Sequence, residues 1–520
     1  MSLGTIALGC VFCIGFLIRG NGNASESPDV TMDLTSLVQK AFEHYDSGRF
    51  EASIQLLTKA DRISPNQPDI LELLAMTHLE ANRPERALHF YERKLSLLSL
   101  GDTNDIATTS YSLGVVYTKL NQPMKAAAYY KDSLRYDEHN SNAHCNLGIV
   151  LAELGQMEEA KSSLRTALLL NPKDDYAAHE LLLIEKQEGE ENLIRELEEK
   201  SERDNLTIFS GFGQIDRRAG LSAKDFVQEY VMQSRPLILT DVASKMVPQM
   251  WNYDYVLDHC RRKKVTLNKR IRDKRLWADL APSRETTVGQ FIEDLLADKT
   301  SEHYLHDYSL PLNCPALLEG LRIPGYFARD FLQRVPNFFR GQPLLYRNMW
   351  PSLFIGPKGT MSGLHIDSLC TNFWMALFKG RKKWTFYEKE AVHYLYYDWT
   401  KSAFKTDPLR PNFESFPLSR YAQKTEVILE PGEVIFVPAE VPHLVVNLED
   451  TIAISANYVD QSNYHCTCDD LEVSGKRQKE KKLLRSVLCS DTFKNNLFEG
   501  LTVVREGADY VNWEEYKSPK

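Results

Sequence analysis

The sequence predicts a multidomain α + β protein in which an α-helical repeat region precedes a β-rich domain with flanking helices. Three observations carry this prediction. Small residues recur every 34 positions early in the chain, short apolar runs alternate with glycine-containing turns between residues 353 and 458, and a His-x-Asp sequence in that second region is followed by a further histidine. With 520 residues, of which 43% are hydrophobic and 26% charged, the chain is long enough for about two to four domains.

The first 185 residues contain an internal repeat. Gly114 and Gly148 are 34 residues apart, and each is followed by an alanine at the same offset. Earlier copies are looser, and extra residues within 96–104 separate the second copy from the third. The pattern resembles tetratricopeptide repeats, whose small residues let antiparallel helices pack closely. About four units are expected over residues 32–185, because one unit cannot bury its apolar face alone.

Changes in composition along the chain set the expected domain boundaries. Residues 185–204 hold nine acidic and four basic residues and are expected to form a charged helix or linker. The chain after the last predicted strand is charged and helical in pattern. The expected segments are a signal peptide or signal anchor at 1–30, the repeat domain at 32–185, a charged linker at 186–206, the β-rich domain at 207–460 and a C-terminal helical extension at 461–520.

The apolar stretch at residues 3–18 is the candidate targeting segment. Its sixteen residues are short for a membrane-spanning helix and suit the hydrophobic region of a secretory signal, although no basic residue precedes them. An uncleaved signal anchor is the alternative interpretation. We therefore favour the secretory pathway, in the lumen of the endoplasmic reticulum or anchored to a membrane, over a nuclear or cytoplasmic location.

Net charge and cysteine usage bound the class of protein further. The formal net charge of -9 argues against a general nucleic-acid binder. The basic run at 261–275 is expected to be a solvated face. Nine cysteines do not form the pattern of a small disulfide scaffold. In an oxidising lumen, Cys466 or Cys468 could bridge to Cys489.

The sequence His365-Ile366-Asp367 is a candidate metal site. Residues i and i+2 of a strand share one face, so His365 and Asp367 can point together into a barrel, and His443 can join them from a neighbouring strand. Two imidazoles and one carboxylate form the facial triad of non-heme Fe(II) oxygenases, which leaves coordination positions open to a co-substrate and O2. His393 lies in an aromatic segment and is expected to be an ordinary residue rather than a fourth ligand.

This region resembles the JmjC-type 2-oxoglutarate oxygenases, a branch of the cupin superfamily, and is closest to their small hydroxylase-like members. The resemblance implies a double-stranded β-helix with Fe(II) held by His365, Asp367 and His443. It also implies 2-oxoglutarate and O2 as co-substrates and ascorbate as the reductant. The segments that carry the resemblance are the turn-rich residues 354–363, the strand–turn–strand pattern at 374–387 and the turn and apolar runs at 430–458.

The same resemblance assigns the co-substrate contacts. Lys382 would pair with the distal carboxylate of 2-oxoglutarate, which agrees with the need of a buried dicarboxylate for a cationic partner. The neighbouring Lys383 is expected to face the other side of its strand. Ser362 stands where relatives carry a threonine hydroxyl near that carboxylate.

Ser455 and Asn457 are two residues apart, and both are expected to face the barrel interior as hydrogen-bonding groups for the co-substrate or the metal ligands. The chain departs from the family pattern at Met375, where some relatives place an asparagine that contacts 2-oxoglutarate. Co-substrate binding is therefore less strongly predicted than iron binding.

The function expected first is an Fe(II)- and 2-oxoglutarate-dependent dioxygenase that hydroxylates a protein side chain, with the repeats binding the polypeptide substrate or a partner in their groove. One alternative is an N-methyl-lysine or N-methyl-arginine demethylase, which uses the same iron chemistry. Another is a catalytically inactive repeat–cupin scaffold. By analogy with the family, helices after the barrel, around residues 483–497, could form a homodimer.

Overall fold

The computed structural model describes residues 28–202, 206–271, 276–299, 302–475, 478–494 and 510–517, and the side chains from residue 34 onward. The predicted leader at residues 3–18 lies outside the described residues. No described helix is long and apolar enough to cross a membrane. The chain divides into two compact units, residues 1–184 and 185–520.

The described part of the first unit consists of antiparallel helix pairs. Each pair packs on the next, as expected for a solenoid of tetratricopeptide type. The connection between the second and third pairs, residues 96–102, is the longest, which agrees with the extra residues predicted there. The helices are α2 (Pro28–Asp46), α3 (Phe50–Ile63), α4 (Pro68–Glu80), α5 (Pro84–Leu95), α6 (Thr103–Lys119), α7 (Pro123–Tyr136), α8 (Ser141–Glu153) and α9 (Met157–Leu170).

The turn inside each helix pair contains one residue in the left-handed backbone region. These residues are Gly48, Asn82, Asn121 and Gly155, with φ values of 71°, 58°, 54° and 77°. Glycine and asparagine are the residues that adopt this conformation at least cost. Their regular recurrence at the same point of each pair gives the repeat a physical basis in the turn as well as in the packed helices.

Small residues allow the close helix packing that the sequence predicts. A Cβ atom built on Gly148 would lie 2.6 Å from Leu164 Cγ, and one on Gly114 would lie 2.5 Å from the ring of Tyr130. Both distances are shorter than van der Waals contact, so only glycine lets α8 approach α9, and α6 approach α7, this closely.

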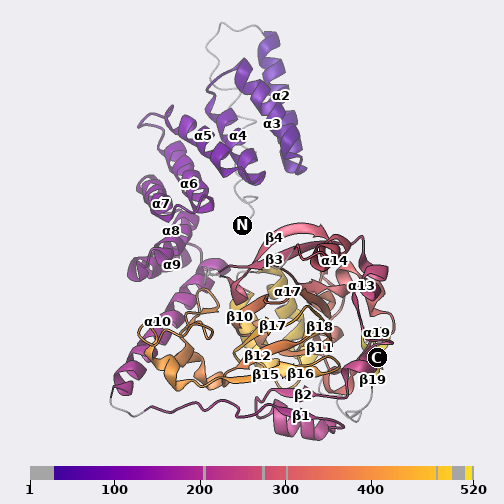
Figure 1. The fold of residues 1–520 in the computed structure, drawn as a ribbon. Coiled ribbons are helices and arrows are strands. Elements are labelled where there is room, and N and C mark those ends of the chain that lie inside the picture. The colour runs from indigo at the N-terminus through magenta and orange to yellow at the C-terminus, as the bar shows by residue number, and fades with distance from the viewer. Residues whose placement is uncertain are drawn as a thin grey trace. The chain divides into compact units, whose positions relative to one another are not determined.

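Two facing sheets form the centre of the second unit (Figure 1). Side chains of both sheets, among them Phe373, Trp384 and Ile435, share one buried cluster between them. In spatial order, the larger sheet contains β1 (Asp216–Arg218), β2 (Leu237–Leu239), β16 (Val434–Val437), β11 (Asn372–Lys379), β18 (Thr451–Tyr458), β9 (Ser352–Gly356), β5 (His303–Ser309), β3 (Lys264–Arg270) and β4 (Leu280–Thr287). The smaller sheet contains β10 (Met361–His365), β17 (His443–Asn447), β12 (Lys382–Phe386) and β15 (Thr425–Leu429).

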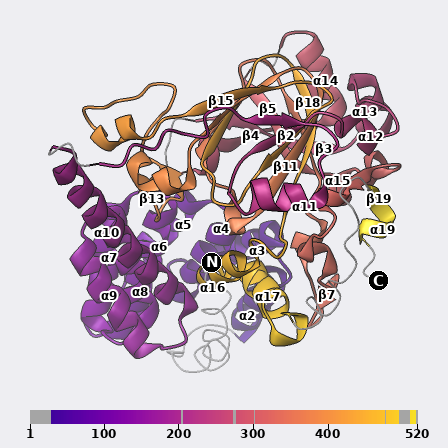
Figure 2. The same cartoon turned by 90° about the horizontal axis from the view of Figure 1, so that it is seen from below.

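Helices and loops cover the outer face of the larger sheet. Helices α13 (Tyr253–Cys260) and α14 (Val288–Leu296) lie beside its β3 and β4 end (Figure 2). The apolar side chains of these helices join a second buried cluster that also contains Trp374 and Phe436 from the sheet. The central strands of the larger sheet are therefore buried on both faces, whereas the candidate ligands His365 and His443 lie on the smaller sheet.

Within the described residues 261–271, the basic run is a surface feature, as expected. Alternate residues of β3 are buried, and Arg261 at the start of the run pairs with Glu293 at 2.6 Å. Arg270 pairs with Asp279 at 3.2 Å. Acids of the protein itself thus neutralise part of this charge.

Helix α10 (Asp175–Ser201) contains the charge-rich segment predicted as a helix or linker, and its part after residue 184 belongs to the second unit. It lies beside the aromatic insert at residues 389–421 in both views (Figures 1 and 2). Glu190 contacts His393 Nδ1 at 2.8 Å and accepts a hydrogen bond from the indole of Trp399 at 3.2 Å. This pairing raises the pKa of His393. His393 is thus a structural residue, as expected.

The C-terminal extension contains a strand as well as helices. Helices α16 (Tyr464–Ser474) and α17 (Lys479–Leu488) are followed by β19 (Tyr510–Asn512), which pairs with β6 (Arg322–Pro324), and by α19 (Trp513–Lys517). Leu484, Val487 and Leu488 are buried in the protein's own core. This part of the region predicted for dimerisation is consequently not free to contact a second copy.

Three disulfides connect described residues of the second unit. They join Cys260 to Cys314, Cys370 to Cys466 and Cys468 to Cys489. The predicted bridge to Cys489 is thus formed by Cys468. Cys145, in the repeats, is buried and unpaired.

Candidate metal centre

The two histidines of the predicted site are cross-strand neighbours. His365 is the last residue of β10 and His443 the first residue of β17, and they oppose one another in the antiparallel register. Both side chains are buried, and their ring centroids are 4.3 Å apart. The neighbouring strand that the sequence could only postulate is therefore β17.

Backbone carbonyls fix the tautomer of both imidazoles. Nδ1 of His365 lies 2.6 Å from the carbonyl oxygen of Gly363, and Nδ1 of His443 lies 3.0 Å from that of Val441. A carbonyl only accepts hydrogen bonds, so each Nδ1 carries a proton and Nε2 is the ring nitrogen available to a metal. Burial, followed by the neighbouring His443, lowers the pKa of His365 well below its usual value. His365 is therefore neutral, as metal coordination requires.

Asp367 joins the two histidines from beyond the end of β10. The strand ends at His365, and Asp367 follows in extended backbone with φ −62° and ψ 139°. One potential ligand atom from each of the three residues lies within 4.8 Å of the other two. Burial raises the pKa of Asp367, while His443 and a hydrogen bond from Asn457 oppose the shift. A bound cation would stabilise the ionised carboxylate that burial disfavours.

These three residues line a cavity of about 70 Å³. Trp384 lines it, and the indole nitrogen of Trp384 is buried without a hydrogen-bond partner among the described residues. Two imidazoles and a carboxylate are a suitable donor set for Fe(II). The residues present thus fit an iron ion.

Lys382 is completely buried on β12, behind the wall of this cavity rather than in it. Its Nζ donates to Asn447 Oδ1 at 2.6 Å and to the Tyr304 hydroxyl at 3.1 Å. Tyr304 lines the cavity and connects the lysine to it. Burial lowers the pKa of Lys382 to about 7. Lys383 points away and lies 3.4 Å from Glu426, as predicted.

The other predicted contact residues separate into two groups. Ser362 and Asn457 line the cavity, as does Met375. Asn457 donates to Thr371 Oγ1 at 2.8 Å. Ser455 is buried opposite Met375 in the β11–β18 register but does not line the cavity, and its hydroxyl has no partner among the described residues.

Sequence reasoning missed the contribution of β5. Tyr304, His306 and Asp307 from this strand line the cavity. His306 Nε2 lies 3.2 Å from Ser362 Oγ, and burial together with the charge of Lys382 lowers the pKa of His306 to about 3. A second cavity, of about 890 Å³, shares His306 and Asp307 with the first. The density of histidine and aromatic residues in the 303–308 segment was the signal available in the sequence.

Trp277 was also missed. Its indole nitrogen donates to the carbonyl oxygen of Ile366 at 3.1 Å, and its ring lies 4.4 Å from the ring of His365. It lines the cavity from a short loop that packs against β10 at Gly363. Trp277 therefore shields one side of the histidine ligand.

Comparison with known proteins agrees with this architecture. Residues 223–464 match the family model of the cupin-like domain, and residues 44–93 and 118–182 match a tetratricopeptide repeat model. The chain is 25% identical over 282 residues to "Lysine-specific demethylase JMJ21" of Arabidopsis thaliana, covering 51% of this chain and 28% of that protein. It is 34% identical over 148 residues to "2-oxoglutarate and iron-dependent oxygenase JMJD4" of Mus musculus, covering 27% and 32%.

A third relative, "Arginine-specific demethylase JMJ20" of Arabidopsis thaliana, is 27% identical over 273 residues, covering 48% of this chain and 58% of that protein. The chain spans between 28% and 58% of the length of these three relatives. Residues 223–464 thus form a cupin-like domain. Tetratricopeptide repeats precede that domain in the same chain.

Proposed function

We propose that the protein is an Fe(II)- and 2-oxoglutarate-dependent dioxygenase that hydroxylates a protein side chain. The observation that carries the proposal is the cluster of His365, Asp367 and His443, in which both imidazoles are buried and each Nδ1 contacts a backbone carbonyl, so that Nε2 is the nitrogen available to a metal. The name of the JMJD4 relative, a 2-oxoglutarate and iron-dependent oxygenase, supports the same chemistry. Bound Fe(II) would supply the activation of O2 that couples decarboxylation of 2-oxoglutarate to oxidation of a C–H bond.

The residues of this chain would bind the metal and the co-substrate, orient them and shield them from water. His365, Asp367 and His443 would hold the iron on one side. Lys382 and Tyr304 would pair with the distal carboxylate of 2-oxoglutarate from behind the cavity, since a buried carboxylate needs charge-assisted hydrogen bonds. Aromatic side chains exclude water from the remaining wall; they are Trp277, Trp350, Phe354, Phe373 and Trp384.

Demethylation of N-methyl-lysine or N-methyl-arginine is the second candidate, because two of the relatives carry demethylase names. Both reactions begin with oxidation of a C–H bond, so the metal centre alone does not separate them. An inactive scaffold is the third candidate, and the methionine at position 375 is its main support.

The three disulfides support our assignment of the protein to the secretory pathway, in the endoplasmic reticulum lumen or anchored to a membrane. Disulfides persist in oxidising compartments and are rare in cytosolic proteins. A secretory location also makes lumenal polypeptides, rather than nuclear ones, the expected substrates.

The first test is succinate formation from 2-oxoglutarate by the purified chain with Fe(II) and ascorbate. We expect succinate above background, and none from a His365→Ala variant measured in parallel. Because turnover can require the true substrate, binding of Mn(II) in place of Fe(II) is measured on the same samples. A wild-type chain that forms no succinate and binds no metal would favour the scaffold.

The repeats are proposed to bind the polypeptide substrate or a partner protein. Removal of residues 28–174 leaves α10 whole and the second unit intact. We expect this truncated chain to keep succinate formation in the absence of protein substrate and to lose activity on the protein substrate. Mass spectrometry of the substrate and a succinate assay measure the two activities. Equal loss of both would show that the repeats support the oxygenase domain itself.

A further inference from the structure

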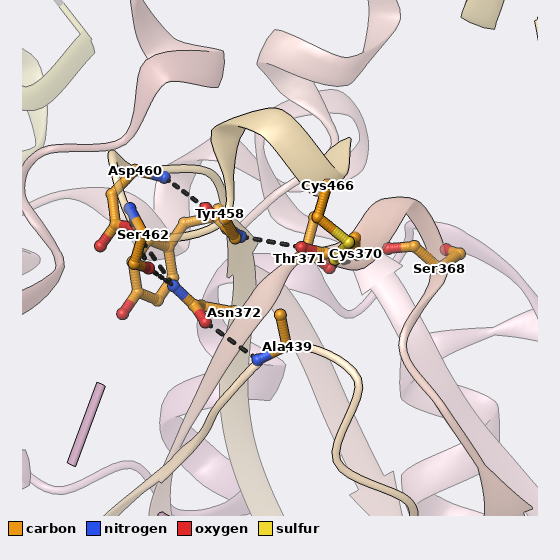
Figure 3. The surroundings of a disulfide bond; sticks show 10 residues. Ser368, Cys370, Thr371, Asn372, Ala439, Tyr458, Asp460, Ser462 and Cys466 are labelled. Carbon is orange, nitrogen blue, oxygen red and sulfur yellow. Dashed lines mark hydrogen bonds between the residues drawn. A yellow bond between two sulfur atoms is a disulfide. The ribbon is translucent and has the colours of Figure 1, made fainter. Parts of the chain in front are cut away.

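The disulfide between Cys370 and Cys466 lies next to the candidate metal centre. Cys370 follows Asp367 by three residues, at the end of the short helical turn Ser368–Cys370. Cys466 lies in the first turn of α16, 96 residues later in the chain. The bond therefore connects the segment immediately after a metal ligand to a helix outside the barrel (Figure 3).

The same disulfide borders the segment that precedes the other ligand strand. A carboxylate oxygen of Glu440, three residues before His443, lies within 4.8 Å of both sulfur atoms. Asn372, just after the crosslinked cysteine, accepts a hydrogen bond from the backbone N–H of Ala439 at 3.0 Å and donates to Ser462 Oγ at 3.0 Å (Figure 3). The segment that follows Asp367 and the segment that precedes His443 thus lie together at this disulfide.

The crosslinked segment has a backbone conformation that leucine and cysteine rarely adopt. Leu369 and Cys370 are consecutive non-glycine residues in the left-handed region, with φ values of 60° and 50°. The side chain of Asn463, directly before α16, donates to the carbonyl oxygen of Cys370 at 2.9 Å. Such a conformation persists only where surrounding contacts determine it, and here the disulfide and Asn463 both come from the same neighbouring segment.

Hydrogen bonds connect this segment to the candidate metal ligand Asp367. Thr371 Oγ1 donates to the carbonyl oxygen of Ser368 at 2.9 Å and accepts from Asn457 at 2.8 Å. Asn457 also hydrogen-bonds to the carboxylate of Asp367. Groups that hydrogen-bond to a metal ligand orient it and tune its affinity for the metal.

The other two disulfides have no such connection. The Cys260–Cys314 bond is completely buried between α13 and a loop. The Cys468–Cys489 bond joins α16 to the end of α17. Neither bond includes a residue within ten positions of a predicted metal ligand. They therefore serve as controls for the general stabilising effect of a disulfide.

We propose that the Cys370–Cys466 disulfide is a positioning element of the metal centre, so that the crosslinked protein binds the metal more tightly than the uncrosslinked one. This inference rests on the proposed iron site. A dithiol that reduces the bond supplies two electrons and two protons, becomes a cyclic disulfide itself and leaves two cysteine thiols. Cys466 is partly exposed, so such a reductant can reach it. Metal affinity would then depend on the redox state of the compartment.

The test compares two double variants of the full chain, Cys370→Ala/Cys466→Ala and Cys468→Ala/Cys489→Ala. Each loses one disulfide of α16. Anaerobic titration with Mn(II) gives the dissociation constant, and the visible spectrum of bound Co(II) reports the coordination geometry. Replacement is preferred to reduction, because free thiols of Cys370 and Cys466 beside Glu440 could themselves bind metal.

We expect the first double variant to bind Mn(II) about 10- to 100-fold more weakly, with a changed Co(II) spectrum. The control is expected to lose thermal stability but to keep wild-type affinity and spectrum. Equal affinity in all three proteins, or equal loss in both variants, overturns the proposal. A wild-type chain that binds no metal overturns the proposed function instead.

A single variant covers the case in which the first double variant does not fold. Asn372→Ala keeps all three disulfides but removes the contact between the crosslinked segment and Ala439. It is expected to weaken Mn(II) binding in the same direction and by a smaller factor. Unchanged affinity and an unchanged Co(II) spectrum in this variant would contradict the proposed role of the segment.

Discussion

An Asp367→Ala variant is expected to lose succinate formation and to bind Mn(II) more than about 100-fold more weakly than the wild type, since even loss of a group that only orients a ligand costs about 10- to 100-fold. Asp367 supplies the one carboxylate of the three-residue cluster. Without it, only two imidazoles remain, and they neither balance the charge of the cation nor complete a three-point face. Metal titration and a succinate assay on the same preparation measure both effects.

Asp307→Asn is the matched control, because Asp307 is another acid that lines the same cavity but does not belong to the ligand cluster. This variant is expected to keep the metal affinity of the wild type. Circular dichroism and thermal melting of both variants report whether the fold is retained. Normal metal binding by Asp367→Ala would remove this residue from the assignment, and weakened binding by Asp307→Asn would extend the site to the second acid.

The candidate metal ligands were predictable because they depend on local rules. The i, i+2 spacing of His365 and Asp367, and a histidine at the start of a later apolar run, are visible without knowing the fold. The expectation that both residues lie on one strand was only partly correct. Strand β10 ends at His365, and Asp367 lies in extended backbone just beyond it. Ser455 was predicted to face the barrel interior; it is buried opposite Met375 in the β11–β18 register but does not line the cavity. Alternation along β18 specifies the face of a side chain, not its depth in the barrel.

The contributions of Tyr304 and His306 were not predictable in this way. They come from β5, which joins the sheet beside β9 through pairing across about fifty residues of chain, and no local pattern encodes that neighbour. The disulfide partners of Cys370 and Cys260 depend on the same long-range folding. The charges of α10 were visible, but Glu190 and Glu198 have their partners in the aromatic insert about two hundred residues away.

Lys382→Met is expected to raise the KM for 2-oxoglutarate by about 10- to 100-fold, the usual effect of removing one charge-assisted hydrogen bond from a buried ligand. Metal affinity is expected to stay unchanged, because Lys382 contacts Tyr304 and Asn447 and none of the metal ligands. Lys383→Met is the matched control on the other face of the same strand, and its KM is expected to equal that of the wild type. A raised KM in Lys383→Met alone would transfer the anchoring role to that lysine.

The buried environment of Lys382 also predicts a dependence on pH. Burial lowers its pKa to about 7 in the folded chain, below the value of 10.5 for an exposed lysine. Above pH 7 the side chain is increasingly neutral, so affinity for the 2-oxoglutarate dianion is expected to fall as the pH rises. Binding should take up a proton near pH 8, because the carboxylate favours the ammonium form. Calorimetry in buffers of different ionisation enthalpy measures this uptake, which Lys382→Met should abolish.

The free energy of unfolding of the ligand-free protein should also depend on pH through Lys382, and the contribution of this group should increase with pH. Between pH 7 and 10.5 the unfolded chain binds a proton at Lys382 that the folded chain does not, so stability from this group rises with pH across that window. Lys382→Met removes the rise, and urea unfolding at pH 7 and pH 9 measures it. An identical pH dependence in wild type and variant would show that the lysine is charged in the folded protein before any co-substrate binds.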